Sequence, residues 1–231
     1  MTYKANQLVS ALYAIHSGPG RTAGKRLEVE VPKAFRARIK HLLNIERARM
    51  EVSSHHTLEP TIIFHDERPR GKGNEVRYSA RNAFALSVCV HLIDAGFPQL
   101  TAYEAVTALW LRLQKEYEHI SAAVQTEGGT TFTSVSDDQA FPKKPARRDP
   151  DIKPADTTVF LLLPQLPRTP SSALTADEIE FIGGTQELTS RLSQLMPHEI
   201  HGTYLLELSG LITRVNELIA KFPPKRRGPN N

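Results

Sequence analysis

Apolar residues recur along the first part of the chain at two spacings, one typical of helices and the other of strands. Residues 3–16 place Leu8, Leu12 and Ile15 three and four positions apart, which predicts an amphipathic helix. The Ser-Gly-Pro-Gly sequence that follows cannot continue a helix and ends it. Residues 26–31 alternate between charged and apolar positions, so we expect a short strand there.

A longer helix is predicted over residues 32–50, where proline occupies the first position. Its apolar side chains repeat at helical spacing, and basic side chains occupy the opposite side. The segment is therefore expected to form an amphipathic basic helix. Its apolar side carries Phe35, Ile39, Leu42 and Leu43, and its basic side carries Lys33, Arg36, Lys40 and Arg47.

Two short strands are expected next, over residues 61–67 and 75–79. The connection between them contains one proline and two glycines, which supply turn geometry, and its basic residues Arg68, Arg70 and Lys72 project outward. The pattern predicts a β-hairpin with a cationic tip. A charged tip of this kind can also be only a soluble turn.

Two more helices follow the hairpin. Residues 80–97 are apolar on nearly every side, which indicates burial, and glycine followed by proline ends this helix. Residues 101–117 form the second predicted helix, with Thr101 and Glu104 at the spacing of a capping box. The single cysteine, Cys89, lies in the apolar helix and is expected in the core, so no internal disulfide is possible.

The composition changes between residues 121 and 155, where Gly, Ser, Thr, Pro and paired charges replace the periodic apolar pattern. This segment is expected to be a flexible linker. Beyond it, residues 157–164 predict a buried strand, residues 169–184 contain a possible strand, and residues 185–196 predict a helix.

The last predicted helix, residues 203–222, has apolar residues alternately three and four positions apart. This spacing is a heptad seam, which packs either on the same chain or on a second copy. We assign it to homodimerisation, with core packing inside the chain as the alternative. The seam residues are Leu205, Leu208, Ile212, Val215 and Ile219.

The distribution of charge along the chain indicates a partner that carries phosphates. The formal net charge is only +4, yet residues 21–49 hold nine basic against three acidic residues. A local excess of this kind suits a surface that meets phosphates, and a solvated helix face is the alternative. No apolar run approaches the roughly 20 residues that span a bilayer, so we expect a cytoplasmic protein without a membrane segment.

No catalytic constellation is recognisable in the sequence. The glycine-rich stretch before Arg26 resembles a phosphate-binding loop only superficially, because arginine stands where Ser or Thr would hold Mg²⁺. His198 and His201 are three positions apart, but no third ligand completes a metal spacing. We therefore expect no enzyme activity, no cofactor and no metal, with an enzyme of unfamiliar site as the alternative.

The basic helix and the predicted hairpin favour nucleic-acid binding over enzyme activity. A winged helix-turn-helix needs a helix that enters the major groove and a neighbouring hairpin whose basic tip grips the flanking phosphates. Residues 32–50 and the predicted hairpin supply both, and a competing arrangement takes residues 82–96 and 101–118 as the helix pair. The candidate DNA-binding residues are Lys33, Arg36, Arg38, Lys40, Arg68, Arg70, Lys72 and Arg77.

The order of these elements resembles the MerR-like winged-helix family of bacterial regulators. A basic helix is followed by a hairpin, by the pair Arg77 and Tyr78, and by a helix that closes with residues 92–97. The resemblance extends over about residues 30–118. It implies wing residues that touch the DNA backbone, homodimerisation through a C-terminal helix and a separate effector part.

These features predict an α+β protein, mostly α, with three parts. Residues 1–120 would form a winged-helix DNA-binding domain, residues 121–155 a linker, and residues 156–231 a small α+β region for dimerisation or sensing. The expected function is a transcriptional regulator that binds double-stranded DNA as a homodimer on an inverted-repeat operator. The alternative is a non-catalytic protein–protein adaptor whose basic loop meets an acidic partner.

Overall fold

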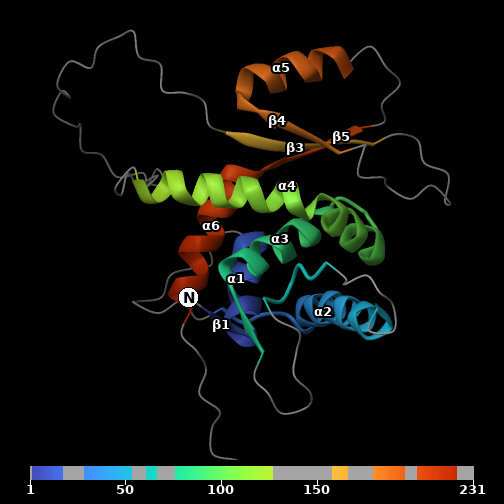
Figure 1. The fold of residues 1–231 in the computed structure, drawn as a ribbon, viewed down its shortest axis with the longest axis vertical. Helices are drawn as coiled ribbons and strands as arrows, with labels where there is room; N and C mark the ends of the chain where they lie inside the picture. Colours follow the sequence, from blue (N-terminus) through green and yellow to red (C-terminus); the bar gives the residue numbers. More distant parts are fainter. Residues whose placement is uncertain are drawn as a thin grey trace, which may run out of the picture.

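A computed structural model shows a body of helices with a small three-stranded sheet at one end (Figure 1). It describes residues 2–17, 29–53, 61–66, 76–126, 158–165, 179–195 and 202–222. The elements in chain order are β1 (Tyr3–Lys4), α1 (Ala5–Ser17), α2 (Lys33–Ser53), β2 (Arg77–Tyr78), α3 (Ala80–Asp94), α4 (Gln99–Thr126), β3 (Val159–Gln165), β4 (Glu180–Gly183), α5 (Gly184–Leu195), β5 (Gly202–Glu207) and α6 (Leu208–Lys221). Among the described helices, none combines the length and the apolar content needed to cross a bilayer.

Helix α3 forms the centre of the helical body. Its side chains are apolar in almost every direction, and ten of its fifteen residues are buried, so it can contact α1, α4 and α6 at once. The predicted burial of this helix and of Cys89 is confirmed. Because burial disfavours the thiolate, it raises the pKa of Cys89 well above its ordinary value.

Helix α6 lies in the same core as the N-terminal helices. It packs against α1, α3 and α4, and the Gln7 side-chain amide donates a hydrogen bond of 2.6 Å to the Phe222 carbonyl. The Tyr117 hydroxyl on α4 donates one of 2.8 Å to Asn216. The boundary expected near residue 120 therefore falls inside α4, and the apolar core continues across it.

The sheet has the strand order β4-β3-β5, and both pairings are antiparallel. Strand β3 is the buried strand that the apolar run predicted. Side chains at alternate positions point to opposite faces of a sheet, so Leu161 and Leu163 join the main core. Phe160 and Leu162 face the other way, where α5 covers them (Figure 1).

The ends of α3 are fixed by local hydrogen bonds. At its start, the side chains of Ser79 and Asn82 cap each other's backbone amides as a capping box. At its end, Gly96 has φ +97°, and the amides of Gly96 and Phe97 donate to the carbonyls of Ile93 and Leu92. This pair of bonds is a Schellman motif, so the predicted glycine stop is confirmed.

Three local predictions are wrong. Residues 29–31 form no strand, because the Val31 carbonyl accepts a hydrogen bond from Arg36 Nε where the chain enters α2. Helix α4 begins at Gln99, so Thr101 lies inside the helix and Glu104 pairs with Arg49 instead of capping. The segment expected as one helix from residue 203 begins as strand β5, because β3 offers it a hydrogen-bonding edge.

Candidate nucleic-acid interface

The predicted hairpin is wrong where the structure describes it. Residues 61–66 form no strand, and β2 pairs with the N-terminal strand β1, with Tyr78 opposite Tyr3. Since β2 reaches its partner across most of the N-terminal half of the chain, the pairing is not a local hairpin. The tip residues Arg68, Arg70 and Lys72 lie outside the described residues.

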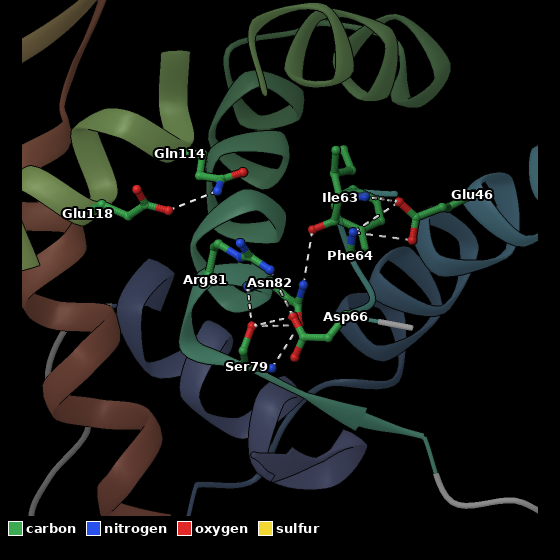
Figure 2. A network of polar contacts seen from close by, with 9 residues as sticks. All are labelled: Glu46, Ile63, Phe64, Asp66, Ser79, Arg81, Asn82, Gln114 and Glu118. Atoms are coloured by element: carbon green, nitrogen blue, oxygen red, sulfur yellow. Dashed lines mark hydrogen bonds and ion pairs between the residues drawn. The ribbon is translucent and has the colours of Figure 1, made fainter. Parts of the chain in front are cut away.

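Residues 61–66 are held instead by one buried carboxylate, that of Glu46 on α2 (Figure 2). Glu46 accepts hydrogen bonds from the backbone amides of Ile63 at 2.6 Å and Phe64 at 3.0 Å. Its second oxygen lies 2.5 Å from Nδ1 of His65. A buried carboxylate must be satisfied by several donors, and here it replaces the strand partner that the backbone lacks.

The same segment is tied to the start of α3. Asn82 donates from Nδ2 to the Ile63 carbonyl at 3.3 Å, while its oxygen helps to cap the helix (Figure 2). The Ser79 hydroxyl donates to Asp66 at 3.0 Å, and Arg81 forms an ion pair with Asp66 at 3.3 Å. Asp66 precedes residues 67–75 in the chain and β2 follows them, and both Asp66 and β2 lie beside α3.

The outer side of α2 carries the basic residues that the periodicity placed there. Lys33, Arg36, Lys40 and Arg47 are all exposed. Burial raises the pKa of Tyr78 in β2, and the nearby Arg47 guanidinium opposes this shift. The end of the basic row on α2 therefore lies close to β2, where Arg77 is exposed.

Arg38 differs from the other candidates on α2. Its guanidinium forms an ion pair of 2.5 Å with Asp94 at the end of α3, and the side chain is about one-third exposed. Arg38 thus joins α2 to α3, and its charge is already neutralised. This residue was predicted as a DNA contact, but its ion pair favours a structural role.

Behind Arg38 lies a buried polar group that the sequence pattern did not indicate. The rings of His16 on α1 and His91 on α3 have centroids 4.2 Å apart, His16 Nε2 lies 3.3 Å from the Ser87 hydroxyl, and the Tyr204 hydroxyl lies 3.2 Å from His91 Nδ1. Burial, with the charges of His91 and Arg38, lowers the pKa of His16 to about 3. Burial also lowers the pKa of His91.

The predicted dimerisation seam is core of the same chain. Leu208, Ile212, Val215 and Ile219 are fully buried against the other helices, so they are not available to a second copy. Leu205 lies in β5 and is 39% exposed. Their spacing arises because α6 packs on α1 and α3 of the same chain, as in the alternative interpretation of core packing inside the chain.

The histidines considered as metal ligands give no site in the described part of the chain. No cluster of three or more His, Cys, Asp or Glu side chains suited to a metal ion occurs among those residues. His198 and His201 lie outside them. The chain matches no protein-family model, no curated protein and no solved structure.

Proposed function

We propose that this protein binds double-stranded DNA and acts as a transcriptional regulator, with α2 as the element that contacts the duplex. The observation that carries the proposal is the exposed row of cations along one side of α2. Among the described residues, no carboxylate forms an ion pair with Lys33, Lys40 or Arg47. These charges remain available for phosphates, which supply much of the affinity of DNA-binding proteins.

The shape of α2 suits the same partner. The helix has 21 residues, which corresponds to about 30 Å at 1.5 Å per residue, and the major groove of DNA admits an α-helix. Small exposed residues lie beside the cations, so the helix backbone can approach a surface closely. These residues are Ala34, Ala37 and Ala48.

The basic segment 67–75 supports the proposal by its place in the chain. It carries Arg68, Arg70 and Lys72, and the described residues that flank it in the chain lie beside α3, at Asp66, and near Arg47, at Tyr78. The resemblance to MerR-like regulators adds the same expectation, because a basic helix precedes Arg77 and a helix that closes on glycine. A homodimer on DNA would need a surface other than the buried seam of α6.

Fluorescence anisotropy with random-sequence duplex DNA at low and at moderate salt tests the proposal. Several phosphate contacts predict that affinity falls steeply as salt increases. The triple variant Lys33→Glu, Lys40→Glu and Arg47→Glu should weaken binding by at least about a hundredfold, because three attractions become repulsions. Circular dichroism should show unchanged helix content, since all three side chains are exposed.

A second triple variant, Lys115→Glu, Arg214→Glu and Lys221→Glu, makes the same change in net charge on α4 and α6. It should retain most of the affinity if α2 is the contact. Equal weakening by both variants would exclude α2 as the interface. If the wild-type protein binds no DNA at low salt, the proposal is wrong, and the adaptor with an acidic protein partner becomes the preferred function.

A further inference from the structure

A cavity of about 360 Å³ lies between α4 and the edge of the sheet formed by β4. One wall is apolar and includes Val159 and Phe181, and the other wall is the side of α4 that carries Arg112, Glu116 and His119. Helix α4 runs along the sheet, with β3 and β4 on the far side of this space (Figure 1). A volume of this size is typical of small-ligand sites, which combine an apolar wall with a few polar groups.

Arg112 lies over the ring of Phe181. Its guanidinium carbon is 4.2 Å from the ring centre, which is a cation–π contact and not a hydrogen bond or an ion pair. Arg112 forms no hydrogen bond or ion pair with the described residues, and its contact with Phe181 is the one described above. The N–H groups along the edge of a guanidinium are the donors that bind a carboxylate through two parallel bonds.

Glu116 lies one helical turn after Arg112, a spacing at which opposite charges commonly pair. Here they do not pair, because Arg112 turns to Phe181, and Glu116 has no ion-pair partner among the described residues. The cavity therefore holds one cation and one anion side by side, each with unused hydrogen-bonding capacity. Arg112 is exposed and Glu116 is half-buried, and a partly buried carboxylate without a partner gains from a ligand cation that pairs with it.

We infer that this cavity binds a small zwitterion with an apolar part, as in an apolar α-amino acid. The ligand carboxylate would bind the edge of Arg112, its ammonium group would bind Glu116, and its apolar side chain would contact Val159 and Phe181. A ligand that carries only a negative charge would be repelled by Glu116, and one that carries only a positive charge would be repelled by Arg112. Only a ligand with both charges satisfies the two residues together.

Isothermal titration calorimetry and ligand-observed NMR with the standard L-amino acids, each at millimolar concentration, test this inference on the full chain without DNA. At least one apolar amino acid should bind. Its methyl ester, which lacks the carboxylate, and its N-acetyl form, which lacks the ammonium group, should each bind about tenfold more weakly or worse.

Variants on α4 separate the two contacts. Arg112→Gln should lower the affinity for the amino acid about tenfold without lowering that for the methyl ester. Glu116→Gln should likewise lower the affinity for the amino acid about tenfold without lowering that for the N-acetyl form. Lys115→Gln and Glu118→Gln remove the same charges from the same helix outside the cavity and should bind like the wild type.

If none of the standard amino acids binds, or if Arg112→Gln and Glu116→Gln bind like their controls, the inference is wrong. The inference does not rest on the proposed DNA binding, because the ligand is titrated into the protein alone. A protein that binds an amino acid but no DNA would therefore overturn only the proposed function, and the opposite result would overturn only the ligand site.

Discussion

His65 Nδ1 lies 2.5 Å from the carboxylate of Glu46, and the two side chains are 1% and 0% exposed. The carboxylate also accepts the backbone amides of Ile63 and Phe64. One side chain of α2 thus satisfies two backbone amides of a segment that pairs with no strand. The segment leads directly into Asp66, at the start of the basic stretch in the proposed interface.

Replacing Glu46 with glutamine should lower the free energy of unfolding by about 3–5 kcal/mol. Glutamine can keep one oxygen on the amides of Ile63 and Phe64, but its NH₂ group would then stand where a carboxylate oxygen now lies 2.5 Å from His65 Nδ1, so the set of acceptors is incomplete. Urea denaturation followed by circular dichroism would measure the loss.

The matched control is Glu104→Gln, which removes the exposed ion-pair partner of Arg49. A surface pair of this kind contributes less than about 1 kcal/mol, so this variant should unfold near the wild-type midpoint. Equal losses for the two variants would mean that the buried contacts of Glu46 add nothing beyond an ordinary surface pair.

The position of Glu46 in the sequence indicates that this charged residue is buried, although its hydrophobicity alone would predict exposure. Glu46 follows Ile39 and Leu42 at helical spacing and precedes Met50 by four, so it occupies the apolar side of α2. A charged residue at a core position indicates a buried partner. Its partners could not be predicted. The backbone amides of residues 63 and 64 need a side-chain acceptor only because no neighbouring strand offers them a carbonyl, and the sequence does not show that this strand is absent.

The regular helices were predictable because their periodicity is local, as α1, α2 and α3 show. The strand expected over residues 75–79 contains β2, but the two-residue strand β1 was not predicted, because it leaves no pattern and its pairing with β2 joins residues far apart in the chain. The seam in α6 was detected at the correct spacing. Periodicity reports that Val215 and Ile219 face something apolar, but it does not tell whether that surface belongs to the same chain.

Single substitutions on α2 should separate phosphate contacts from structural charges. Lys40→Gln should reduce the slope of log affinity against log salt by about one, because one counterion-releasing contact is lost. Arg38→Gln should leave this slope almost unchanged, since Arg38 is already paired with Asp94. Anisotropy titrations over a series of salt concentrations would measure both slopes. If Arg38→Gln reduces the slope as much as Lys40→Gln, then Arg38 leaves Asp94 to bind DNA.

Truncation of Ile219 to alanine should destabilise the chain by about 2–5 kcal/mol, because it removes a fully buried side chain and leaves a cavity. Leu205→Ala, at an exposed position of β5, should cost much less. Denaturation would measure the stabilities, and sedimentation velocity would measure the oligomeric state. The oligomeric state of Ile219→Ala should equal that of the wild type. If the folded variant is a monomer while the wild type is a dimer, the seam contributes to an interface between two copies, and its assignment to the core of one chain is wrong.

The buried histidines make stability depend on pH in a direction that can be derived. The pKa of His16 is about 3 in the folded protein against an ordinary value of 6.5, so the unfolded chain binds more protons between these values. Acidification therefore favours unfolding, by at most about 1.4 kcal/mol for each pH unit below the unfolded pKa, and the stabilisation is fully present above it. The lowered pKa of His91 acts in the same direction.

His16→Asn removes one of these titrations and should make the free energy of unfolding less dependent on pH. Between about pH 6.5 and pH 5 the wild type should lose about 2 kcal/mol more than the variant, measured by urea unfolding at each pH. Asp94 lies 3.5 Å from His16 and forms the ion pair with Arg38, and the substitution leaves both of these residues in place. The exposed His119 provides the control, and His119→Asn should keep the wild-type slope. Equal slopes for all three proteins would show that His16 accepts a proton in the folded state as readily as in the unfolded chain.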